Sequence, residues 1–255
     1  MNDETSGAEP DDAEPEYLNP EQIQPMALAS ALTSLELLSD DPWMRMQAHN
    51  LDIVDTFLMG LEYEVLGEWF RTDRTPADTH FLQAQSQMWI FAAYELLRTW
   101  HQRARDIIKW SQGGGLEQKL KALKDASEGY THFGREVRIS QLEKVKSTPG
   151  LVDKIQSHLR ILHITFSRLE YIRVSIAKHE ISGRAKSVAM APGYGRINTH
   201  CGSLDFQLEN GKYIMGTISR RDIADELRAV DVRASPPSQD TLDKFDAYME
   251  GRINY

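Results

Sequence analysis

The segment from Thr75 to Trp110 constrains the fold more than any other part of the chain. It opens with Thr75-Pro76, a helix-capping residue followed by a proline in the first turn, where a helix tolerates it. No glycine or proline then interrupts the chain until Gly113. Residues 88–100 are apolar on nearly every side, which is typical of a helix surrounded by other helices. We therefore expect a mainly α protein, a multi-helix bundle built around this segment.

Two further segments show the three- and four-residue apolar spacing of amphipathic helices. One follows the cap signal Asp41-Pro42, and the other runs from about Val152 to Ile176 with basic residues on its opposite side. We expect Phe91 of the central helix and Phe166 of the Val152–Ile176 segment to lie in the core. The first segment predicts a helix that carries the apolar residues Met46, Ile53, Val54, Phe57, Leu58, Leu61, Val65, Leu66 and Trp69.

The chain divides into three parts by composition. Residues 1–18 carry seven Asp or Glu and no Lys or Arg, which predicts a disordered acidic tail. Residues 19–181 form the expected helical bundle. Residues 182–255 contain a loop, alternating apolar residues from Leu204 to Leu208 followed by Asn-Gly, and a Ser219 helix cap. This pattern predicts a small C-terminal β-hairpin plus helix appendage packed on the bundle.

The charge distribution bears on the partner. The net charge is −9, yet residues 98–200 carry nineteen Lys or Arg against nine Asp or Glu. This basic region either neutralises the acidic first part inside the fold or binds an anion such as nucleic acid. Neutralisation is favoured, because net acidity opposes non-specific nucleic-acid binding. A protein partner is therefore expected, and a homodimer is compatible with the sequence.

Apolar runs, the cysteine count and short motifs indicate the compartment and the cofactors to expect. No apolar run reaches the roughly 18 residues of a membrane span, so we expect no membrane partner. The single cysteine, Cys201, excludes an internal disulfide and favours the cytoplasm. No paired cysteines and no His-Glu-x-x-His occur, and residues 113–115 lack the Lys-Ser/Thr of a phosphate loop. We expect no metal and no cofactor.

A first candidate binding surface lies where the 184–202 loop meets the hairpin. Loops of this length in compact domains tend to be functional, and tyrosine and arginine are enriched in binding hot spots. A pair of arginines at the following helix start adds positive charge beside backbone amides that favour anions. The predicted surface therefore combines Tyr194, Arg196, Arg220 and Arg221. Alternatively, the two arginines pair with Asp222, Asp225 or the acidic first half.

A second candidate is a polar cluster on the central helix. Its members are spaced three or four residues apart and share one side of the helix: Glu95, Arg98, His101 and Arg105. A carboxylate, guanidinium and imidazole together are able to hold an anion or move a proton. The alternative is structural, with Glu95 and Arg98 as a stabilising ion pair.

Two short motifs are similar to those of known families. Residues 219–227 resemble the first helix of bacterial winged-helix repressors, which implies helix-turn-helix DNA binding through residues 219–250. The segment in the position of the second helix, residues 238–246, carries three aspartates against one lysine, the wrong charge for a phosphate backbone.

Arg74 and His80 have the Arg-to-His spacing of the HEPN class, whose small helical bundles often act as ribonucleases. This resemblance implies a metal-independent nuclease with Arg74 and His80 in a site at a dimer interface. The chain departs from the pattern at Thr75, where Asn, Asp or His is favoured, and at Pro76 within it. The favoured hypothesis is a cytosolic, non-catalytic helical binding protein. The alternative is an all-α ribonuclease.

Overall fold

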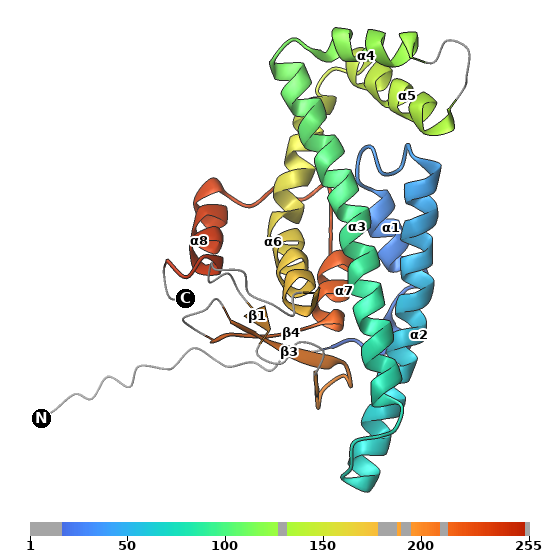
Figure 1. Ribbon diagram of the computed structural model, residues 1–255, viewed down its shortest axis with the longest axis vertical. Coiled ribbons are helices and arrows are strands. Elements are labelled where there is room, and N and C mark those ends of the chain that lie inside the picture. Colours follow the sequence, from blue (N-terminus) through green and yellow to red (C-terminus); the bar gives the residue numbers. More distant parts are fainter. Residues whose placement is uncertain (1–16, 127–131, 178–187, 190–194, 210–213, 253–255) are drawn as a thin grey trace, which may run out of the picture.

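The computed structural model describes residues 17–126, 132–177, 188–189, 195–209 and 214–252. It confirms a mainly α fold with a small antiparallel sheet near the C-terminal end of the chain (Figure 1). The helices described are η1 (Pro20–Gln22), α1 (Ala27–Thr33), α2 (Pro42–Thr72), α3 (Thr79–Gln112), α4 (Leu116–Asp125), α5 (Phe133–Ser147), α6 (Leu151–Ala177), α7 (Arg220–Arg228) and α8 (Gln239–Met249). The strands described are β1 (Val188–Ala189), β2 (Arg196–Ile197), β3 (Leu204–Glu209) and β4 (Ile214–Ser219).

The two longest helices, α2 and α3, form an antiparallel hairpin whose turn projects beyond the sheet (Figure 1). α2 begins where expected, because the Asp41 carboxylate accepts hydrogen bonds from the backbone N–H groups of Trp43 and Met44. α3 begins later than the Thr75-Pro76 signal predicted, at Thr79, so the proline lies in the connecting turn. α3 ends at Gln112, before the glycines.

The core lies where α3 packs against α6 and α2 and where α1 and α7 close the remaining side. Trp89 and Trp100 of α3 are fully buried. Their indole N–H groups donate to the carbonyl oxygens of Leu51 at 3.0 Å and Glu36 at 2.8 Å, which meets the need of a buried indole for a partner. Phe91 and Phe166 are only partly buried and pack at the edge of the core, so the expectation for them was wrong.

Two helical segments differ from the sequence-based expectation. Apolar residues from Ile23 to Leu38 recur at helical spacing, a pattern that by itself predicts one helix. Only Ala27–Thr33 of this stretch is α-helical, because Pro25 and a left-handed Met26 (φ 62°) precede it. Residues 133–147 gave no clear prediction and form α5, which packs with α4 as a second hairpin. No helix within the described residues combines the length and apolarity that a membrane crossing needs.

The last strand of the sheet leads directly into α7, which packs in the bundle. β3 and β4 pair antiparallel with Phe206 opposite Ile218, and both side chains are buried. The hairpin is therefore confirmed, although its predicted Asn210-Gly211 turn lies outside the described residues. Ser219 ends β4 and caps α7, exchanging hydrogen bonds with Asp222 as a capping box. α7 follows without a linker and contacts α1, α3 and α6.

Candidate functional site

The four side chains of the predicted loop surface do not form one surface. Tyr194 lies outside the described residues. Arg196 is exposed on β2, where it pairs in register with Asp205 of β3. Arg220 and Arg221 have exposed fractions of 0%, so they offer no charge to a partner. This corrects the expectation of an arginine surface, because both guanidinium groups have their partners inside the fold. Arg220 donates to Glu62 and Asp55, and Arg221 donates to Asp225 and to a backbone carbonyl, as in the alternative stated above.

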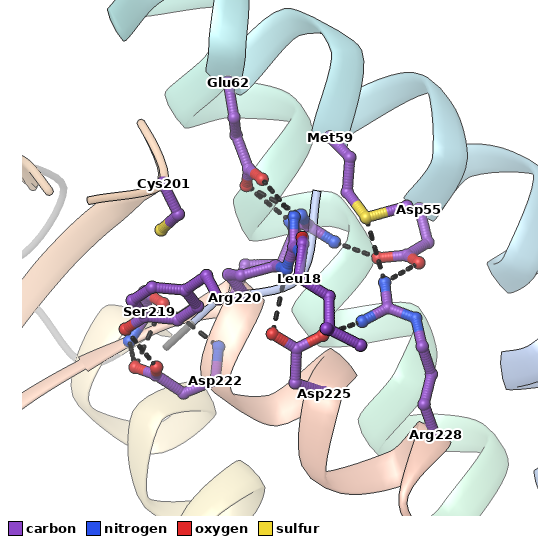
Figure 2. A network of polar contacts seen from close by, with 12 residues as sticks. Leu18, Asp55, Met59, Glu62, Cys201, Ser219, Arg220, Asp222, Asp225 and Arg228 are labelled. Atoms are coloured by element: carbon purple, nitrogen blue, oxygen red, sulfur yellow. Dashed lines mark hydrogen bonds and ion pairs between the residues drawn. The ribbon is translucent and has the colours of Figure 1, made fainter. Parts of the chain in front are cut away.

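Arg220 occupies the centre of a buried ionic network between α2 and α7 (Figure 2). Its Nε and Nη2 atoms donate to Glu62 Oε1 at 3.0 and 2.7 Å, and its Nη1 donates to Asp55. The guanidinium carbon lies 5.4 Å from the centroid of the Trp89 ring. The two carboxylates come from positions seven apart on α2, so they share the side that faces α7.

Three further groups extend this network along α7. Arg221 donates to Asp225 at 2.9 Å and to the backbone carbonyl of Leu18, and Arg228 donates to Asp225 and Asp55. Together with Asp55, Glu62 and Arg220, these groups make a network of three carboxylates and three guanidinium groups, so its formal charges balance. Balanced and hydrogen-bonded buried charges are the arrangement in which burial is tolerated. The network therefore fixes α7 against α2.

The innermost atoms of the network are incompletely paired. Glu62 Oε2 and Arg221 Nη1 lie 3.9 Å apart, and neither atom has a hydrogen-bond partner. Burial raises the pKa of Glu62, and Arg220 opposes that rise. Beside this pair, burial raises the pKa of the Cys201 thiol to about 12, so the thiolate needed for nucleophilic chemistry is strongly disfavoured at neutral pH.

Asp205, on β3 of the same region, should make the stability of the folded protein depend on pH. Burial raises its pKa to about 6, although Asn198 Nδ2 donates to both carboxylate oxygens at 3.2 Å. When the folded-state pKa of a carboxyl group is raised, its charged form lowers the free energy of unfolding at a pH above that pKa. This loss of stability disappears as the pH falls and the group becomes protonated. Relative to an Asp205→Asn variant, the wild type should gain stability as the pH falls from 7 to 4.

Urea unfolding of both proteins at each pH measures this difference, and a carboxyl NMR titration should place the Asp205 midpoint near 6. A difference between the two proteins that stays constant from pH 7 to pH 4 would show that Asp205 has an ordinary pKa in the folded state.

The four side chains of the polar cluster on α3 do not converge in the structure. Glu95 and Arg98 form an ion pair of 2.6 Å with both side chains about half exposed. His101 instead stacks on Phe166 of α6 with ring centroids 4.7 Å apart, and burial followed by repulsion from Arg105 lowers its pKa. Arg105 is exposed. The arrangement matches the structural alternative for Glu95 and Arg98 and does not aim the four side chains at one point.

Arg74 and His80 lie at the projecting end of the α2–α3 hairpin. Arg74 is in the turn, His80 is the second residue of α3, and both are exposed. A cleft near this end is lined by neighbouring residues of α2, including Tyr63 and Glu68, and by Asp78, but by neither Arg74 nor His80. The pair is therefore accessible to solvent without being held in that cleft.

Among the described residues, four cations of the basic region pair with carboxylates of the acidic first part: Arg98, Arg103, Lys144 and Lys154. Lys144 binds Glu36 and Asp40, each at 3.0 Å, and Arg103 binds Asp41 at 2.5 Å. Burial opposes the charge on Lys144, but the two carboxylates raise its pKa above the usual value. These pairs reduce the positive charge available to an anionic partner.

An exposed apolar surface along α2 and α3 was missed at the sequence level. Met46, Ile53, Val54 and Phe57 belong to the apolar residues that predicted α2, and all four are exposed, Phe57 by 57%. On α3, Met88 is 63% exposed although Trp89, the next residue, is buried. We call this surface the α2–α3 face, with large apolar members Met46, Ile53, Val54, Phe57, Phe81 and Met88.

A groove of about 340 Å³ runs between the two helices within this face. Asn50 and Val54 line it from α2, and Gln85, Met88 and Ala92 line it from α3. These α3 residues, with Phe81, recur at intervals of four and three, the spacing of a helix seam that packs against another helix. The α2–α3 face therefore has the shape and periodicity of a helix-packing surface without a covering element in the described residues.

The α2–α3 face carries little charge. Of the side chains that line its groove, only that of Glu95 is charged, and it is paired with Arg98. Residues 81–94 contain no Asp, Glu, Lys or Arg, and the two acids between Met46 and Gly60, Asp52 and Asp55, are buried. Charged side chains resume at the borders, with Glu64 on α2 and Glu95 on α3. An apolar, uncharged centre with a polar rim is the anatomy of protein–protein interfaces. The signal in the sequence was this charge-free stretch, of which only the part from Met88 onward had predicted a helix surrounded by other helices.

Comparison of the chain with models of protein families, with curated proteins and with solved structures gives no match.

Proposed function

We propose that this protein is a non-catalytic binding protein of the cytoplasm that acts by docking an apolar, uncharged protein surface on the α2–α3 face. The observation that carries the proposal is the charge-free, exposed centre of this face in a chain of which 26% is charged. An exposed apolar patch of this kind on a folded protein usually marks an interaction site. The buried free thiol of Cys201 fits a reducing compartment.

The polar candidates give less support to catalysis. Cys201 is buried with a raised pKa, and the α3 cluster of Glu95, Arg98, His101 and Arg105 does not converge. The DNA-binding alternative is weakened because Arg220 and Arg221, at the start of its first helix, are buried in ion pairs. The ribonuclease alternative retains one favourable observation, the exposure of Arg74 and His80 at one end of the molecule.

Site-specific photo-crosslinking in cells tests the proposal. A photoreactive amino acid replaces Met88 at the centre of the face, and the same amino acid replaces Gln156, an exposed residue of α6, in the control. We expect cross-links to protein from position 88 and markedly fewer from position 156. Equal yields from both positions would count against a docking role for the α2–α3 face.

The nuclease alternative has its own readout. The purified wild type, Arg74→Ala and His80→Ala proteins are incubated with single-stranded RNA without added metal. The proposal predicts no cleavage above that of the buffer. Cleavage by the wild type that both substitutions abolish would establish the enzyme and overturn the non-catalytic assignment.

A further inference from the structure

We infer that the partner of the α2–α3 face is a second copy of this chain, packed face to face about a two-fold axis. This inference rests on the proposed function, because it names the occupant of the same surface. The antiparallel α2–α3 hairpins of two copies would then form a four-helix layer, an arrangement in which apolar side chains of one pair fill the groove of the other.

The charge distribution favours a second copy over an unrelated partner. In a two-fold interface, residues near the axis meet their own counterparts, so any charged residue there would face a like charge. Each copy carries a net charge of −9, which makes the contact of most of its surfaces unfavourable. The outward positions from Met46 to Gly60 and from Phe81 to Tyr94 avoid this repulsion, because no exposed Asp, Glu, Lys or Arg lies there.

The size of the face matches what a stable dimer needs. α2 has 31 residues and α3 has 34, so each helix is about 45–50 Å long. The six large apolar members of the face are between 38% and 63% exposed. At on the order of 200 Å² for a large side chain, they present roughly 600 Å² of the roughly 800 Å² that each partner buries in a standard interface. Asn50, Gln85 and Ala92 between them add to that area.

Segments of the chain outside the described residues are poor candidates for covering this face. Residues 1–16 carry seven acids and only three apolar side chains, those of Met1, Ala8 and Ala13. The internal segments are ten residues long or shorter, and the longest, residues 178–187, contains two lysines, an arginine and a glutamate. An apolar face of this length requires a partner with an equally long apolar surface, and the α2–α3 hairpin of a second copy provides one.

Sedimentation velocity of the full-length protein tests the inference. A monomer has a mass of 29.1 kDa, and we expect the wild type to sediment as a dimer at micromolar concentration. Phe57→Glu/Met88→Glu places two charges in the centre of the face and should weaken the dimer by at least about 100-fold. The control Gln118→Glu/Gln156→Glu adds the same charge at exposed positions of α4 and α6 and should remain dimeric.

A charge-complementation arm makes the test specific for a face-to-face pair. Phe57→Lys/Met88→Lys should also be monomeric alone, but an equimolar mixture with the glutamate variant should form a heterodimer, because the two faces then carry opposite charge. Thermal denaturation of each variant verifies that these exposed substitutions leave the fold intact.

Three results would overturn the inference. They are a wild type that stays monomeric at on the order of 100 µM, a glutamate variant that remains dimeric, and a mixture of variants that fails to pair. The proposed function is tested separately. Cross-links from position 88 to a different protein, with a monomeric wild type, would refute the second copy and leave the docking role intact. Equal cross-linking from positions 88 and 156 would refute the docking role itself.

Discussion

Replacing Arg220 with methionine is expected to lower the free energy of unfolding by about 3–5 kcal/mol. The methionine side chain keeps much of the volume but removes the hydrogen bonds to Glu62 and Asp55, which are both buried. Glu62 would then keep no guanidinium hydrogen bond and Asp55 only that of Arg228, at a cost that local relaxation cannot offset. Urea denaturation followed by circular dichroism measures the loss.

A matched control separates burial from ion pairing as such. Arg98→Met breaks the Glu95–Arg98 pair, whose side chains are about half exposed, and should cost less than about 1 kcal/mol. Arg220→Lys should fall between the two, because an ammonium group keeps the charge but cannot reproduce the fork of donors that reaches both carboxylates. A loss below about 1 kcal/mol for Arg220→Met would show that the network contributes little to the attachment of α7.

Gly202→Ala is expected to cost about 2–5 kcal/mol, a large loss for the addition of one methyl group. Gly202 has φ +77°, which L side chains rarely adopt, and a Cβ atom there would lie 1.9 Å from the carbonyl oxygen of Glu62. Because that neighbour is the backbone of α2, no side-chain rotation relieves the contact. The loop from Asn198 to Ser203 would have to withdraw from α2 and uncover the buried charges.

Gly114 provides the control for backbone conformation. It has φ +69°, but no atom lies within 4 Å of the position of an added Cβ. Gly114→Ala should therefore show the conformational strain alone, roughly 1–2 kcal/mol. The difference between the two variants in thermal or urea unfolding measures the steric contact at Glu62. Equal losses would mean that the loop does not approach α2 as closely as the structure shows.

The structure exposes several apolar residues of α2 and α3 and buries two arginines of α7. Helical periodicity correctly grouped Val54, Phe57 and Met88 with other apolar positions, but periodicity cannot tell a face that packs within the chain from one that packs against another molecule. The same limit applies to Arg220 and Arg221. Arginine at a helix start usually faces solvent, but Asp55 and Glu62, more than 150 positions earlier, pair with Arg220 inside the fold. Arg221 is buried beside it and donates to Asp225 and to the backbone carbonyl of Leu18.

The sequence by itself determined the local elements. Asp41-Pro42 and Ser219 set the starts of α2 and α7, the glycines after Gln112 set the end of α3, and alternation from Leu204 to Leu208 set β3. Each of these signals acts over a few residues, through capping hydrogen bonds, backbone freedom and side-chain alternation, so it is legible without the fold.

Only the tertiary structure decided which polar groups meet and which apolar faces stay open. The pairing of α7 with α2, the contact of Gly202 with Glu62 and the exposure of the α2–α3 face all depend on contacts between segments far apart in the chain. Their free energies come from burial and from charges brought together, which depend on distance in space and not on spacing in the sequence. The burial of the arginines and the exposure of the apolar α2–α3 face therefore became visible only when the helices were placed against one another.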